Sequence, residues 1–252
     1  MKITIFRKLL EYVSNWHVFC LVYFGFFSNR FYVLKLKNGL QIKLRTNSTD
    51  IQAFVNVWLQ QEYAKEKFEI HKNDIVIDVG GHVGLFSIYA AYFCKYGTVF
   101  SFEPDKENFG LLQENIMLNK LENIKSFNLA ISSKSGKLKI YQNKCDQAAH
   151  TIFGIGENFV EVKTQSLQEV FASNSIVKCS LLKLDCEGAE YEILDSLPNE
   201  YFEKIDKICL EYHQIENSPI LLHELKTHLE TLGYKIMDYP ITNNTGLLFA
   251  YK

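Results

Sequence analysis

The sequence predicts an α/β fold with a mostly parallel, doubly wound sheet. From residue 74 onward, strand-like apolar runs alternate with helix-like segments, an order typical of a parallel sheet with helices on both faces. The runs at 75–79 and 181–184 are rich in apolar residues, as strands buried on both faces are. A glycine-rich segment at 80–84 and an acidic one at 185–190 follow them directly. Because α/β sheets bind ligands at such strand ends, both segments are candidate site elements.

The composition is that of a globular protein. The chain has 252 residues, of which 47% are hydrophobic and 22% charged, which excludes disorder for most of it. Its 27 Lys and Arg against 29 Asp and Glu give a net charge of −2, which argues against a broad basic surface and hence against a nucleic-acid partner. None of the six cysteines forms a CxxC pair. Cysteines within apolar runs are typical of a reducing compartment, so we expect a cytoplasmic protein.

Residues 1–45 are predicted to form an extension, with a helix and a β-hairpin, ahead of a domain at 46–252. Basic residues precede an apolar run at 16–27, which is shorter than the ~20 residues needed to cross a bilayer. His17 interrupts the run and no small-residue cleavage site follows, so a cleaved signal peptide is the weakest interpretation. We expect a helix packed on the domain. The alternatives are peripheral contact with the inner membrane surface through residues 1–27, and burial of this aromatic segment in a homodimer.

The individual elements follow from local patterns. Alternating residues at 31–37 and 40–44 flank Asn38-Gly39, a strong hairpin signal because both central residues accept positive φ. The polar stretch 47–50 is suited to capping a helix that runs to about residue 63. Further helices are expected at 85–93, 106–119 and 218–232, and further strands at 98–102, 124–129, 138–141, 160–162, 207–211, 234–237 and 247–251.

The first candidate site element, from Asp78 to Gly84, lies at a strand end and opens a helix. Glycines let the backbone turn sharply and approach a ligand, but the spacing G-G-x-x-G matches neither GxGxxG nor a P-loop. Glu103-Pro104 ends the next strand, where a carboxylate can accept both hydrogen bonds of a ribose diol. Together they predict a site for an adenosine-bearing cofactor. The plainer alternatives are a tight turn and a carboxylate that favours a helix N-terminus.

Carboxylates also crowd the ends of two later strands. Asp185, Glu187 and Glu190 lie close together in the sequence and could supply a general base or hold a cationic cofactor. Glu190 could instead simply favour a helix N-terminus. Glu211 and His213 end another strand, and a His beside a carboxylate is a candidate base, although a lone His is more often structural.

In this order, the segments 78–84, 103–104, 183–190 and 211–213 resemble the FkbM family of methyltransferases, which use S-adenosylmethionine (SAM). The resemblance covers roughly residues 45–215. It implies a Rossmann-like SAM-dependent methyltransferase fold with an antiparallel C-terminal strand. It also implies that the glycines face the methionine part of the cofactor, that one acid binds the ribose and that another lies near the sulfonium. The residues implied to bind SAM are Asp78, Gly80, Gly81, Gly84, Glu103, Pro104, Ala130 and Asp185.

The resemblance favours O-methylation of a sugar hydroxyl in a glycan, glycolipid or natural product, as in polysaccharide biosynthesis. The substrate oxygen would attack the methyl carbon in line, and removal of the hydroxyl proton would help. We predict His213 or Asp185 as the base, with Glu187 and Glu211 orienting it or the carbohydrate acceptor. A divalent metal could instead bridge these oxygens, although we assign no metal ligand. The polar segment 142–158 is expected to shape the acceptor pocket.

Two alternatives come from other functional classes. A nicotinamide-dependent oxidoreductase would share the strand–loop–helix start, but the lack of GxGxxG and the acidic segment 185–190 count against it. A catalytically silent Rossmann-like binding module would keep the fold, and the presence of Asp78, Glu103 and Asp185 counts against that.

Overall fold

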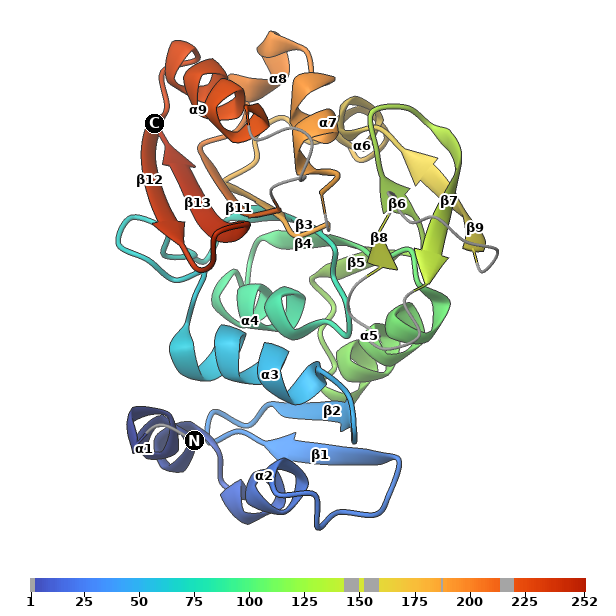
Figure 1. Ribbon diagram of the computed structural model, residues 1–252, viewed down its shortest axis with the longest axis vertical. Coiled ribbons are helices and arrows are strands. Elements are labelled where there is room, and N and C mark those ends of the chain that lie inside the picture. The colour runs from blue at the N-terminus through green and yellow to red at the C-terminus, as the bar shows by residue number, and fades with distance from the viewer. Residues whose placement is uncertain (1–2, 143–149, 152–158, 187, 214–219) are drawn as a thin grey trace.

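The computed structural model describes residues 3–142, 150–151, 159–186, 188–213 and 220–252. Its main sheet is built from β3 (Ile75–Val79), β4 (Thr98–Phe102), β5 (Ile124–Phe127), β10 (Leu181–Leu184), β11 (Lys207–His213), β12 (Lys235–Pro240) and β13 (Thr245–Tyr251). The seven strands lie in the order β12-β13-β11-β10-β3-β4-β5 (Figure 1). Strands β11 to β5 in this order are parallel, whereas β13 runs antiparallel to both β11 and β12. The predicted fold class and its antiparallel C-terminal strand are confirmed.

Helices cover both faces of this sheet (Figure 1). On one side lie α4 (Leu85–Phe93) and α5 (Lys106–Leu118), and on the other α6 (Leu167–Ser173), α7 (Glu190–Asp195), α8 (Asn199–Phe202) and α9 (Leu221–Thr231). Successive strand side chains point to opposite faces, so Val76 packs in one core while Ile77 and Val79 pack in the other. This double burial explains the apolar runs in the sequence.

A second, smaller sheet follows β5. It contains β6 (Ala130–Ile131), β7 (Gly136–Gln142), β8 (His150–Thr151) and β9 (Phe159–Gln165), in the order β6-β9-β7-β8. The predicted strand 124–129 therefore ends early. The Asn128 side-chain amide donates to the carbonyls of Glu103 and Pro104 at 2.9 and 3.0 Å, which turns the chain out of the main sheet. Most of the segment 142–158, predicted to shape the acceptor pocket, lies outside the described residues.

The N-terminal elements are α1 (Ile3–Tyr12), α2 (Trp16–Tyr23), β1 (Phe31–Lys35) and β2 (Gln41–Arg45). Two helices thus stand where we expected one, and the second ends at Tyr23 rather than 27. The predicted hairpin is present, but its turn is longer than a two-residue type I′ turn. Only Gly39 of the central pair has positive φ, at +92°, while the Asn38 side chain accepts a hydrogen bond from the Leu40 N–H at 3.2 Å.

The N-terminal elements pack onto the rest of the molecule. Leu9 and Phe19 are fully buried in the core that contains α4. The outer edge of β2 is covered by α5, because Asn115 and Asn119 hydrogen-bond the backbone N–H and C=O groups of Lys43 and Gln41. The division of the chain at residue 45 stays a prediction. Among the described residues, no helix is long and apolar enough to span a membrane.

Between the hairpin and β3 lies a helix in two parts, α3 (Asp50–Phe54) and the π-helix η1 (Val55–Gln60). The predicted single helix to about residue 63 stops at Gln61, whose φ is +54°. A π-helical turn widens the helix and often occurs at functional sites. Here it directs the following residues, Glu62 and Tyr63, toward the carboxyl ends of the strands, where they line a cavity.

Candidate active site

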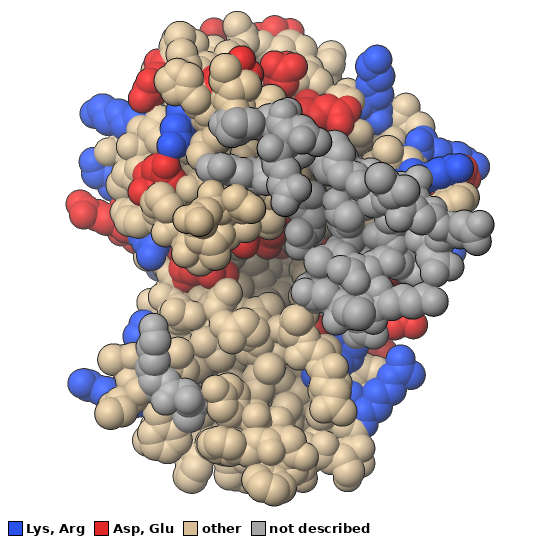
Figure 2. Space-filling model, viewed as in Figure 1, with Lys and Arg blue, Asp and Glu red and all other residues tan. Residues whose placement is uncertain are grey.

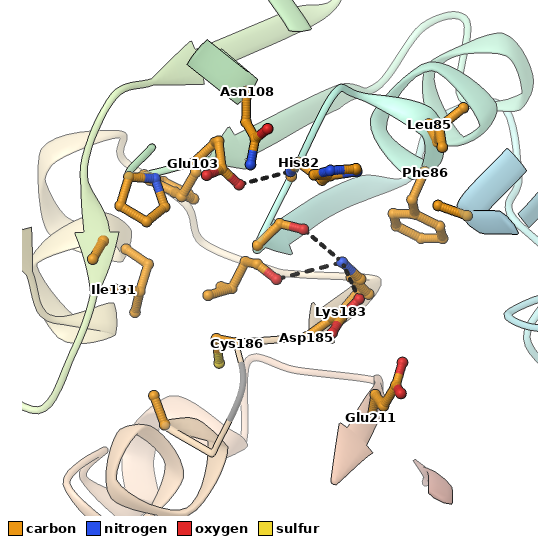
Figure 3. Close-up of a pocket in the computed structure, with 18 of the residues that line it drawn as sticks. His82, Leu85, Phe86, Glu103, Asn108, Ile131, Lys183, Asp185, Cys186 and Glu211 are labelled. Atoms are coloured by element: carbon orange, nitrogen blue, oxygen red, sulfur yellow. Dashed lines mark hydrogen bonds and ion pairs between the residues drawn. The ribbon is translucent and has the colours of Figure 1, made fainter. Parts of the chain in front are cut away.

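A cavity of about 350 Å³ lies at the carboxyl ends of β3, β4 and β10. Its other walls come from α3 and η1, from the small sheet and from β11 (Figure 3). The cavity is therefore at the strand ends where doubly wound sheets bind ligands. Of the residues predicted to bind SAM, six line it: Gly80, Gly81, Glu103, Pro104, Ala130 and Asp185.

The glycine loop allows two close approaches that no side chain would permit. Gly80 has φ +79°, and a Cβ on it would lie 1.8 Å from the Asp185 carbonyl oxygen. A Cβ on Gly81 would lie 2.3 Å from Ser101 Oγ. The loop thus packs directly on the ends of β10 and β4. Gly84 is not among the described cavity residues and instead begins α4 against Leu112.

Glu103 is held on one side of the cavity by backbone groups. Its Oε2 accepts a hydrogen bond from the His82 N–H at 2.7 Å, and its Oε1 accepts one from the Asp105 N–H at 2.9 Å. Burial raises the pKa of Glu103 to about 7. The Asn108 side chain also hydrogen-bonds Glu103. A carboxylate can accept about four hydrogen bonds, so acceptor capacity remains for a ligand. The buried Asn108 Oδ1 in the same wall has no hydrogen-bond partner among the described residues.

Lys183 lines the cavity and connects its two sides (Figure 3). The Nζ is 3.1 Å from Asp78 Oδ1 and 3.6 Å from Asp185 Oδ2, and it donates to the Gly80 carbonyl at 2.9 Å. Burial opposes the charge on Lys183, but Asp78 and Asp185 outweigh it and raise its pKa. Lys183 had no predicted role, because a lysine in an apolar run gives no local sign of its partners.

Asp78 itself lies below the cavity rather than in its wall. The side chain is fully buried and is not among the described cavity residues. Ser87 Oγ donates to its Oδ2 at 2.5 Å, and Lys183 lies at its other oxygen. Burial raises the pKa of Asp78. In this structure Asp78 therefore supports the loop through Lys183.

The side of the cavity away from Glu103 carries a cluster of carboxylates, Glu62, Asp185 and Glu211. The Tyr63 hydroxyl donates to Asp185 Oδ2 at 3.3 Å. Burial, followed by the charges of Glu211 and Asp185, raises the pKa of Glu62 to about 8. Glu62 and Tyr63 had no predicted role. Their only signal in the sequence was that they lie within residues 45–215, which resemble the family.

His213 lies behind this cluster. Its Nδ1 is 3.5 Å from Glu190 Oε1, and its Nε2 is 3.9 Å from Glu211 Oε1. His213 is not among the described residues that line the cavity. Glu190 is fully buried and accepts hydrogen bonds from the N–H groups of Cys186 and Gly188 at 2.9 and 2.8 Å, so it holds the loop after β10. The predicted Glu187 lies outside the described residues.

The N-terminal hairpin supports a residue of the cavity wall from behind, which the sequence did not indicate. Arg45 pairs with the buried Asp50 through two side-chain hydrogen bonds of 3.0 and 2.7 Å. Its Nη2 lies 3.2 Å from Nε2 of His82, a cavity residue. Burial lowers the pKa of His82, so the neutral ring accepts from Arg45. Asp50, predicted as part of a helix cap, instead anchors this arginine.

Comparison with known proteins decides the family. Residues 78–236 match the family model described as the methyltransferase FkbM domain. The chain belongs to the FkbM methyltransferase family. It is 23% identical over 185 residues to Methyltransferase 1 of Beauveria bassiana, with 65% of this chain and 73% of the relative covered.

Two further relatives of this FkbM-family chain have names that state an acceptor. The first is 31-O-demethyl-FK506 methyltransferase FkbM of Streptomyces tacrolimicus, 22% identical over 81% of this chain and 89% of the relative. The second is hexuronic acid methyltransferase AglP of Haloferax volcanii, 27% identical over 58% of each chain. The family membership sets aside the nicotinamide-dependent oxidoreductase and supports SAM as the cofactor.

The cavity of this FkbM-family methyltransferase fits SAM on two observations. The Gly80 backbone lies where a Cβ would be excluded, and Glu103 with Asn108 leaves polar acceptors in the wall. A metal is a different matter. Across the described part of the chain, no group of three or more His, Cys, Asp or Glu side chains is arranged to hold a metal ion.

Proposed function

We propose that this methyltransferase transfers the SAM methyl group to a hydroxyl of a sugar or sugar-like acceptor, carried by a glycan, a glycolipid or a natural product. The observation that supports it is the division of the cavity. Glu103 is fixed by backbone groups on one side, and Asp185 and Glu211 lie on the other (Figure 3). Glu62 lines the cavity close enough to both for their charges to raise its pKa. The named activities of two relatives, on a hexuronic acid and on a demethylated natural product, point the same way.

On the cofactor side, Glu103 would accept the two ribose hydroxyl hydrogen bonds, with Asn108 beside it. Pro104 and Ala130 would contact the adenine, since both line this side of the cavity. Asp185 would lie near the sulfonium, which supplies an electrophilic methyl group when SAM is bound. Asp78 would act indirectly, by fixing Lys183 and through it the Gly80 carbonyl.

On the acceptor side, we assign Glu62 the role of base, in preference to the candidates His213 and Asp185. A base is most effective when its pKa is close to the working pH, and that of Glu62 is about 8. As the hydroxyl oxygen forms its bond to the methyl carbon, the carbon–sulfur bond breaks and the hydroxyl proton moves to Glu62. Asp185, held by Tyr63 and Lys183, would orient the acceptor together with Glu211.

The first test is calorimetric titration of the purified protein with S-adenosylhomocysteine and, separately, with NAD. We expect the homocysteine compound alone to bind. Well-folded protein that binds neither compound would favour the catalytically silent module, and binding of NAD alone would contradict the proposal.

The second test is a screen of acceptors with methyl-labelled SAM. Neutral monosaccharides, hexuronic acids and non-sugar polyols should be compared at equal concentration. Labelled product from a sugar that keeps its label in mild base, as a methyl ether does and a methyl ester does not, would support the proposal. Label found only on nitrogen or on a carboxylate would overturn it.

A further inference from the structure

The two N-terminal helices and the turn that follows α2 expose an apolar surface, which we call the N-terminal patch. Its members are Ile3, Phe6, Leu10, Trp16, Phe24 and Phe26. Ile3 is 88% exposed, Phe26 78% and Phe24 62%. Exposed apolar residues that occur singly are ordinary, whereas a contiguous group of this kind marks an interaction site.

The patch belongs to ordered structure. The fully buried Leu9 on α1 and Val13 just after it hold the helix against the core. Ile3, Phe6 and Leu10 follow the i, i+3, i+7 spacing of one helix side. The apolar side of α1 is therefore wider than the part that packs on the protein, and its remaining apolar side chains face outward. The rings of Phe6 and Trp16 meet edge to face with centroids 6.3 Å apart, which joins the surface of α1 to that of α2.

Charge indicates what covers this patch. Residues 1–37 contain six Lys or Arg and one Glu, a net charge of +5, although the whole chain has −2. The other residues therefore carry −7. Arg7 and Arg30 are both exposed, Arg7 on α1 and Arg30 in the segment between α2 and β1. Figure 2 shows this pole of the molecule as largely uncharged, with basic side chains at its edges and acidic ones above it.

Aromatic and aliphatic side chains flanked by Lys and Arg are the composition of helices that lie in a membrane interface. An anionic bilayer would attract this pole and repel the acidic remainder, which would orient the molecule. A second copy fits less well, because a two-fold dimer through the patch would place the same basic side chains opposite each other.

We propose that residues 3–30 dock this protein on the surface of an anionic bilayer, without crossing it. The patch would enter the boundary between headgroups and acyl chains, and Arg7 and Arg30 would contact the headgroups. The hairpin leads directly into α3, whose Gln52 and Ala53 line the cavity. Docking would therefore hold the cavity on the side of the hairpin and α3 that faces away from the membrane (Figure 1). The inference does not depend on the reaction that the cavity performs.

The test is sedimentation of the full-length protein with vesicles of phosphatidylcholine alone, and with vesicles that also contain phosphatidylglycerol. We expect binding to the anionic vesicles, weaker binding to the neutral ones, and a loss of the difference at high salt. The double variant Phe24→Ser/Phe26→Ser should bind anionic vesicles at least about tenfold more weakly, because two aromatic side chains no longer leave water. Arg7→Glu/Arg30→Glu should remove the preference for phosphatidylglycerol.

The matched control is Tyr96→Ser/Val177→Ser, which removes two apolar side chains that are 78% and 81% exposed outside the N-terminal elements and should leave binding unchanged. Unchanged titration with S-adenosylhomocysteine would show that each variant is folded. Equal sedimentation of the wild type and Phe24→Ser/Phe26→Ser would overturn the proposal. The proposal would also be overturned if the wild type were a dimer in light scattering and bound no vesicles, and if this variant dissociated the dimer. A second copy would then cover the patch.

Discussion

The two sides of the cavity are built in different ways. On the cofactor side, Glu103 is fixed by backbone N–H groups from the neighbouring loop and from its own turn. On the acceptor side, Asp185 is held by Tyr63, 122 positions away in the sequence, and by the side chain of Lys183. The first arrangement depends on local chain geometry, and the second on side chains that meet only in the folded protein.

The difference has an electrostatic consequence. The pKa of Glu103 is raised to about 7 by burial, whereas that of Glu62 reaches about 8 through burial and the neighbouring charges of Glu211 and Asp185. A substitution on the cofactor side should therefore affect only the contacts of the substituted residue. Changes on the acceptor side should alter the protonation of the whole carboxylate cluster.

The largest effect is expected at Lys183, which touches both sides. Lys183→Met would leave the buried Asp78 without its cation, and losing one partner of a buried ion pair costs about 3–5 kcal/mol of unfolding free energy. Denaturant unfolding measures it. Lys178→Met is the control, since its pair with Asp206 is exposed and should contribute less than ~1 kcal/mol. Equal losses for the two variants would contradict the structural role of Lys183.

Gly80→Ala should come next, at about 3 kcal/mol, because backbone strain adds to a clash with the Asp185 carbonyl. Gly233→Ala is the matched control. Its φ of +87° is similar to the +79° of Gly80, but its Cβ would meet nothing within 4 Å, so only the strain of about 1–2 kcal/mol applies. Thermal unfolding compares them. Equal losses of stability in the two variants would mean that the Gly80 backbone does not approach the Asp185 carbonyl as closely as described.

The affinity of Glu103→Ala for S-adenosylhomocysteine distinguishes the cofactor side from the acceptor side. Two hydrogen bonds to a charged group would be lost, which corresponds to roughly 100-fold weaker binding of S-adenosylhomocysteine. Glu211→Ala, on the acceptor side, should change that affinity less than about threefold, because it removes no cofactor contact. Calorimetric titration of both variants measures the affinity. A larger loss of affinity for Glu211→Ala than for Glu103→Ala would mean that the cofactor and acceptor sides are the reverse of those proposed.

Glu62→Gln tests the base by its pH dependence. A base acts when deprotonated, so wild-type kcat/KM should rise with pH and level off above about 8. At pH 7 only about a tenth of Glu62 would be ionised, so most of its contribution as a base would be missing in the wild type as well. The variant should therefore be only about tenfold slower than the wild type at this pH. The gap should widen toward pH 8. A wild-type profile that is flat from pH 6 to pH 9, or a variant that keeps the same rise, would assign the proton to another group.

Several features could be predicted because they depend on short segments. The positions of β3, β4, β10 and β11 follow from apolar runs buried on both faces. The loop after β3 and the acid after β4 follow from their place at strand ends. The prediction of the hairpin turn was wrong in detail. The Asn38 side chain accepts a hydrogen bond from the backbone, and the turn is longer than two residues. The break after Phe127 depends on a contact of Asn128 with Glu103 and Pro104 that no local pattern shows.

By itself, the sequence determined the fold class, the family and the place of Glu103 at the end of a strand, since periodicity and strand-end motifs are encoded within a few positions. Only the tertiary structure decided that Asp78 lies beneath the cavity, that Lys183 joins its two sides and that Glu62 faces Asp185 and Glu211. Side-chain charges interact through space, and burial sets their strength. Partners more than a hundred positions apart, such as Asp78 and Lys183, therefore become visible only when the strands are placed side by side.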